Sequence, residues 1–112
     1  MDLGLNGRCA LVTGGSRGIG FGVARLLAAE GCHLHLVSRT AVDLERARTS
    51  ILAAHPVNIT CHALDLSAPG AAARLARACG AIDILIVFLA SDRASYVSGT
   101  VVTVDGGAAA RG

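Results

Sequence analysis

The sequence predicts an α/β fold in which a parallel sheet of about five strands is flanked by helices. Short runs rich in Val, Leu and Ile alternate with longer segments that have the apolar periodicity of helices. Strands separated by helices of this length are typical of βαβ units, which build parallel sheets. The whole chain, residues 1–112, has the size of one small domain.

Each element can be placed from its composition and its boundaries. The expected strands are residues 8–13, 32–37, 58–64, 82–87 and 99–107. The first helix is expected over residues 18–30, ended by a glycine, and the third from Ser67 to Cys79, opened by Ser67 and Pro69. Thr40 is expected to cap the second helix, and Asp43, three residues later, completes a variant of the capping box.

The segment TGGSRGIG, residues 13–20, lies where the first strand turns into the first helix. Glycines let the backbone turn tightly and approach a ligand closely, and the free N–H groups of a helix start attract an anion. The strand–turn–helix context favours a pyrophosphate over the alternative of a plain tight turn. Gly14, Gly18 and Gly20 are the candidate glycines.

The motif ALVTGGSRGIG resembles the short-chain dehydrogenase/reductase (SDR) family, and the resemblance extends over nearly the whole chain. ALDLS (63–67), IDILI (82–86) and FLASDRASYVSGTVVTVDGG (88–107) are similar to further segments of that family. The resemblance implies a Rossmann-like domain that binds a dinucleotide, with Asp65 beside the adenine. The cofactor-binding residues that it implies are Thr13, Gly14, Ser16, Arg17, Gly18, Ile19, Gly20, Asp65 and Leu66.

The end of the second strand distinguishes between the two dinucleotides. NAD-binding domains carry an acidic residue about 20 positions beyond the loop, which accepts the ribose 2′-hydroxyl. Here that position holds Ser38 and Arg39, and Arg39 can pair with a 2′-phosphate, reinforced by Arg17. The sequence therefore predicts NADP(H) over NAD(H); the alternative is that both arginines are solvated surface residues.

Residues 83–92, DILIVFLASD, run from a strand into what looks like the last turn of a helix, residues 88–91, with no loop between them. Resemblance to the family implies that two distant parts of a longer parent are joined near residues 86–88. A parallel return from the fourth strand to the last would then have to fit into residues 88–99, giving the order 3-2-1-4 with the last strand beside the fourth. Otherwise the fourth strand would be an open apolar edge.

The family's catalytic residues are a Ser and a Tyr-x-x-x-Lys pair, and this chain contains no Lys. Its single tyrosine, Tyr96, is followed four residues later by Thr100, and we interpret it as structural. We therefore expect no catalytic residues and no activity of the chain alone. The alternative function is a non-enzymatic remnant that acts in subunit association, because the family's final strand lies at a subunit interface.

Composition limits the other partners. A net charge of +2 is too small to indicate nucleic acid, and no signal peptide or membrane span is visible, so we expect a cytoplasmic protein with reduced cysteines. The run ILIVFLA, residues 84–90, is typical of self-pairing segments and indicates a homo-oligomer or aggregation. His33, His35 and His62, with Cys61 nearby, would lie on neighbouring strands, but we expect no metal site, because helices should cover both faces of the sheet.

Overall fold

The computed structural model describes residues 4–14, 16, 18–90 and 97–103. In chain order the elements are β1 (Cys9–Thr13), α1 (Gly18–Ala29), β2 (His33–Ser38), α2 (Ala41–Leu52), β3 (Ile59–Ala63), α3 (Ala71–Cys79), β4 (Ile84–Ala90) and β5 (Val97–Thr103). They form one five-stranded sheet in the order β3-β2-β1-β4-β5. The predicted α/β class, the four parallel strands and the strand order are confirmed.

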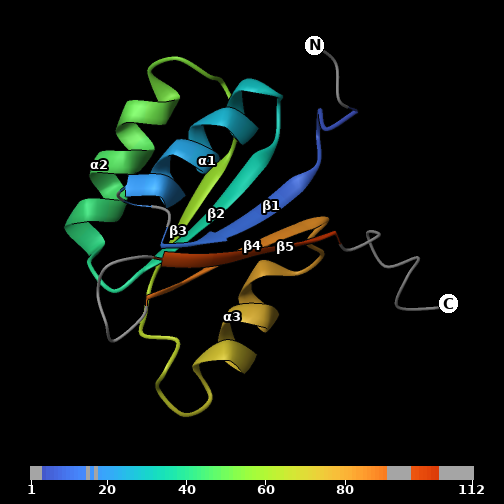
Figure 1. Ribbon diagram of the computed structural model, residues 1–112. Helices are drawn as coiled ribbons and strands as arrows, with labels where there is room; N and C mark the ends of the chain where they lie inside the picture. Colours follow the sequence, from blue (N-terminus) through green and yellow to red (C-terminus); the bar gives the residue numbers. More distant parts are fainter. Residues whose placement is uncertain (1–3, 15, 17, 91–96, 104–112) are drawn as a thin grey trace, which may run out of the picture.

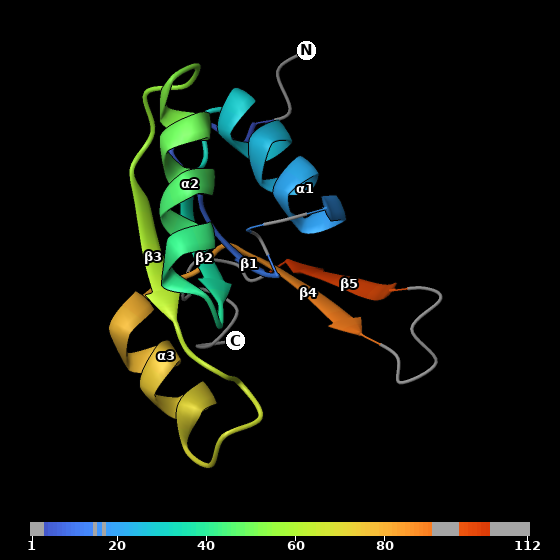
Figure 2. The ribbon, with the colours of Figure 1, turned by 90° about the vertical axis from the view of Figure 1, so that its left-hand side faces the viewer.

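The helices lie on both faces of the sheet, as expected. Figures 1 and 2 show α1 and α2 together on one face and α3 on the other. The larger apolar core lies between the sheet and α1 with α2, and it includes the fully buried side chains of Leu34, Leu36 and Leu44. A smaller core lies under α3 and contains Leu11 and Leu75.

The last strand differs from the prediction in its direction. β5 pairs with β4 in antiparallel orientation, with Ile84 opposite Thr103 and Ala90 opposite Val97, and not as a parallel strand after a crossover. An antiparallel partner needs only a short connection, whereas a parallel one needs about a dozen residues or more. β4 is therefore paired on both sides, with β1 and β5, and it is not an open edge.

Three local predictions were also wrong. Residues 88–90, expected as the end of a helix, belong to β4, because their backbone continues the ladder with β5. α3 begins at Ala71 and not near Ser67, since Asp65 accepts hydrogen bonds from the backbone and side chain of Ser67 and holds that segment in a turn. The strand expected over 99–107 begins at Val97, and residues 104–107 lie outside the described part of the chain.

The capping box at the start of α2 is only partly confirmed. Thr40 is the N-cap residue by position, but its side chain makes no capping hydrogen bond. Its backbone N–H instead donates to the hydroxyl of Ser38, at 3.3 Å. The start of α2 is in this way tied to the end of β2.

Candidate cofactor-binding site

The sheet order places a topological switch point at the carboxyl end of β1. From β1 the chain passes through β2 to β3 on one side, while β4 lies on the other side of β1. In open α/β sheets, ligands bind in the crevice that forms at the carboxyl ends of the strands at such a point. The glycine loop, which follows β1, lies there.

The loop has the backbone geometry that its sequence predicts. Gly14 and Gly18 have φ values of +66° and +59°, in the left-handed region where a side chain is strained. Gly18 opens α1, whose first turn has free N–H groups, and Gly20 is buried, which lets the helix approach the sheet closely. This is the arrangement that binds a phosphate at a helix N-terminus.

Two hydrogen bonds fix the loop against the end of β2. The backbone N–H of Gly14 donates to the carbonyl of Val37 at 2.8 Å. The hydroxyl of Ser16 donates to the hydroxyl of Ser38 at 3.2 Å. The contact with Val37 involves only backbone atoms, so no residue type in the sequence could have indicated it.

The structure brings the predicted residues to one end of the sheet. Thr13 is buried, Ser16 and Ser38 are half-buried, and the exposed members are Gly14, Gly18, Ile19, Arg39, Asp65 and Leu66. Ile19 is 64% exposed although it is apolar, and it lies in the first turn of α1. Arg17 lies outside the described residues.

Two described charged residues lie at this end of the sheet, Arg39 just after β2 and Asp65 just after β3. Two hydrogen bonds from Ser67 lower the pKa of the Asp65 carboxyl, and the positive charge of Arg39 lowers that pKa further. Arg39 and Asp65 are therefore close enough to interact, although they follow different strands. The edge of the site therefore has one positive group, Arg39, and one negative group, Asp65.

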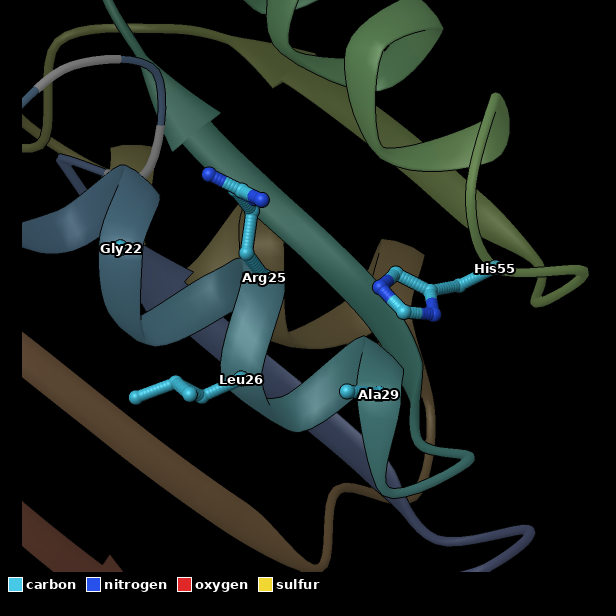
Figure 3. Close-up of a pocket in the computed structure, with 5 residues that line it drawn as sticks. All are labelled: Gly22, Arg25, Leu26, Ala29 and His55. Carbon is cyan, nitrogen blue, oxygen red and sulfur yellow. The ribbon is translucent and has the colours of Figure 1, made fainter.

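The described structure also has a shallow hollow of about 270 Å³ on the outer side of α1. Figure 3 shows its lining, with His55 pointing toward α1 from the segment after α2. The other lining residues are Gly22, Arg25, Leu26 and Ala29, and none of the predicted cofactor residues takes part.

Among the described helices none is both long and apolar enough to span a bilayer.

Comparisons with known proteins identify relatives of this chain. The sequence model described as short chain dehydrogenase matches residues 8–90. Galactitol 2-dehydrogenase (L-tagatose-forming) of Cereibacter sphaeroides is 40% identical over 82 residues, which cover 73% of this chain and 32% of the relative. The chain thus spans about a third of the length of this curated relative.

Solved structures give the same result. L-sorbose reductase from Gluconobacter frateurii, complexed with NADPH and L-sorbose, superposes with a TM-score of 0.69 at 36% identity, covering 76% of this chain and 34% of that one. An alcohol dehydrogenase from the archaeon Thermococcus sibiricus, complexed with 5-hydroxy-NADP, gives a TM-score of 0.62 at 30% identity, covering 70% of this chain and 35% of that one. The chain belongs to the short-chain dehydrogenase/reductase family.

Proposed function

We propose that this chain is an NADP(H)-binding module that holds the pyrophosphate and the 2′-phosphorylated adenosine of the cofactor. The observation that carries the proposal is the pair of hydrogen bonds from Gly14 to Val37 and from Ser16 to Ser38. They hold the phosphate-binding loop beside the strand end that carries Arg39, so one ligand can reach both. The two similar structures complexed with NADPH and with 5-hydroxy-NADP support the same cofactor.

The preference for NADP(H) rests on Arg39. Its exposed guanidinium follows β2 at the position where an NAD-binding domain carries an acid. A guanidinium forms strong, charge-assisted hydrogen bonds with a phosphate. Asp65, which follows the neighbouring strand β3, interacts electrostatically with Arg39. It is the residue that we expect beside the adenine.

The second part of the proposal is that the chain alone does not catalyse hydride transfer between NADP(H) and a carbonyl or alcohol. Such transfer needs a positioned acid or base, worth about 10²–10⁴-fold, and the chain has no Lys to accompany a tyrosine in the family's pair. Tyr96 lies outside the described residues. The family match ends at residue 90, close to the proposed join near residues 86–88.

Binding and turnover test the two parts separately. Fluorescence titration should show NADPH binding with a Kd of about 10 µM to 1 mM, tighter than NADH, because only half of the cofactor is held. NADPH mixed with ketones, aldehydes and 3-oxoacyl thioesters should show no oxidation above buffer. Equal affinity for NADH would contradict the assigned cofactor, and turnover that Tyr96→Phe abolishes would contradict the assigned inactivity.

Subunit association is the second candidate function, because β5 ends the sheet and its sequence, VSGTVVT, carries no charge. A strand edge without charges can pair with a second copy of the chain. Size-exclusion chromatography at several concentrations tests this, and a monomer at every concentration would rule it out.

All four cysteines are free in the structure, which supports the cytoplasmic location that we also propose and that cell fractionation would test.

A further inference from the structure

Three potential metal ligands converge on the face of the sheet that α3 covers. They are His35 on β2, His62 on β3 and Cys79 at the end of α3, and their ligand atoms all lie within 4.8 Å of one another. The Nδ1 atom of His35 is 3.0 Å from the Nε2 atom of His62, and the Sγ atom of Cys79 is 3.5 Å from that same Nε2 atom. The three residues are half-buried, so a ligand can reach them from solvent.

The register of the sheet explains why these residues meet and others do not. His62 on β3 pairs with Val37 on β2, so its side chain lies on the same face of the sheet as those of Val37 and His35. His35 and His62 are therefore on neighbouring strands. Cys61 points to the opposite face, where its thiol contacts the carbonyl of Leu44 on α2. The third ligand instead comes from α3, where Cys79 follows the buried Leu75 by one helical turn.

One nitrogen atom takes part in both short contacts of this cluster. The Nε2 atom of His62 has either one proton or one lone pair, so it can make only one full hydrogen bond to its two neighbours. One of the two contacts is therefore not a full hydrogen bond. A cation placed between the three ligand atoms would accept a lone pair from each of the three groups.

The spacing suits a tetrahedral cation of the zinc class. With Zn–N bonds of about 2.0–2.1 Å and a Zn–S bond of about 2.3 Å, tetrahedral geometry places two nitrogens about 3.3 Å apart and a nitrogen and a sulfur about 3.6 Å apart. The observed separations of 3.0 and 3.5 Å are close to these values. The third separation, between His35 and Cys79, is at most 4.8 Å.

The surroundings also suit a cation. The cluster is partly buried, and this burial lowers the pKa of His62 and raises that of Cys79. Burial, reinforced by His62, also lowers the pKa of His35, so burial favours the neutral form of both imidazoles. Leu11, Leu75 and Leu85 belong to the apolar core under α3 on which the cluster borders.

The geometry points to a binding site for a borderline divalent cation such as Zn²⁺, formed by His35, His62 and Cys79, with solvent in the fourth position. Binding would transfer the proton of the Cys79 thiol to solvent and form one metal–sulfur and two metal–nitrogen bonds in place of bonds from the cation to water, with no change of oxidation state. The expectation of no metal site assumed full cover of both faces, but the three groups are half-exposed. The site is separate from the glycine loop, so it does not depend on the proposed cofactor.

Titration of the reduced full chain with Co²⁺, followed by absorption spectroscopy, tests the site. We expect one Co²⁺ per chain, tetrahedral visible bands, a thiolate-to-cobalt charge-transfer band, and displacement of Co²⁺ by Zn²⁺. Cys79→Ser should abolish the charge-transfer band, and both Cys79→Ser and His62→Gln should weaken binding by about 100-fold or more, because losing even an outer partner of a metal ligand costs about 10–100-fold.

Cys61→Ser is the matched control, because Cys61 lies on β3 next to His62 but its thiol contacts α2 on the other face of the sheet. It should leave the spectrum and the affinity unchanged. Circular dichroism and urea unfolding of each variant show whether a loss of binding reflects unfolding; where Cys79→Ser does not fold, His62→Gln and His35→Gln carry the test. Absence of a thiolate band in the natural chain, one metal per two chains, or equal losses in Cys61→Ser would overturn the assignment.

Discussion

The hydroxyl of Ser16 in the glycine loop donates a hydrogen bond of 3.2 Å to the hydroxyl of Ser38 at the end of β2. The two residues are far apart in the sequence. The bond joins the glycine loop, which would contact the pyrophosphate, to the end of β2, where Arg39 would contact the 2′-phosphate. Ser38 also accepts a hydrogen bond from the backbone of Thr40. Arg39, between these two residues, is therefore presented from a constrained segment.

We expect Arg39→Asp to weaken NADPH binding by about 10-fold to 100-fold, because a hydrogen bond to a charged group contributes about 1.5–3 kcal/mol. NADH binding should stay the same or improve, since the new carboxylate can accept the ribose hydroxyl. Fluorescence titration with both cofactors measures the change. Arg25→Asp, an equal charge change in the middle of α1, is the control and should leave the ratio of the two affinities unchanged.

Gly18→Ala should destabilise the fold by about 1–2 kcal/mol, because φ is +59° there and a Cβ atom is strained in that region. Relief of the strain would turn the first N–H groups of α1 away from the phosphate, so NADPH affinity should also fall, by about ten-fold. Urea unfolding and NADPH titration measure the two effects. An unchanged affinity would show that the loop does not hold the pyrophosphate.

Gly22→Ala is the matched control for that variant. Gly22 lies in the interior of α1, it is exposed, and a Cβ atom there would meet nothing within 4 Å. Replacing a helical glycine by alanine stabilises a protein by about 0.5–1 kcal/mol. We expect that gain in stability together with unchanged NADPH binding.

Stability should fall as the pH drops below about 6.5. Burial lowers the pKa of His35 and of His62 from the ordinary value of 6.5, and His62 lowers that of His35 further. Below 6.5 the unfolded chain binds protons first, so the stabilisation is fully present above 6.5 and is lost as the pH falls through the lower pKa values of the folded state. Urea midpoints between about pH 7.5 and pH 5 measure this, above the range in which carboxylates titrate.

His62→Gln should flatten this pH dependence, because it removes one of the two groups and its effect on His35. His55→Gln is the control; this histidine lies beside α1 and not in the cluster, so the slope should stay that of the natural chain. An equal slope in His62→Gln would show that other groups cause the dependence.

Pairing of β5 with β4 should keep the chain from aggregating. Gly99 and Thr100 lie opposite Phe88 and Val87, and in an antiparallel strand the N–H groups of consecutive residues point to opposite sides. Of the variants Gly99→Pro and Thr100→Pro, one therefore removes a bond to β4 and the other affects only the outer edge. We expect one of them to form larger species by size-exclusion chromatography while the other stays like the natural chain. Equal behaviour would mean that β5 does not protect β4.

The sequence by itself determined the family, the parallel part of the sheet and the phosphate-binding loop. These features depend on local rules: apolar runs set the strands, and TGGSRGIG can only turn tightly because of its glycines. The candidate residues at the carboxyl ends of β1, β2 and β3 followed from the same rules, since parallel strands present these ends at one edge. The choice of NADP(H) likewise depends on Ser38 and Arg39, which are adjacent in the sequence.

Only the tertiary structure decided the direction of β5 and the partners of the histidines. The run from Ile84 to Ala90 is apolar throughout, so no periodicity distinguishes a buried strand from a helix end, and pairing with β5 settles it. Cys79 joins His35 and His62 because α3 crosses the sheet at that position, whereas sequence proximity suggested Cys61. Such contacts join segments distant in the sequence, and their geometry depends on how helix and sheet pack.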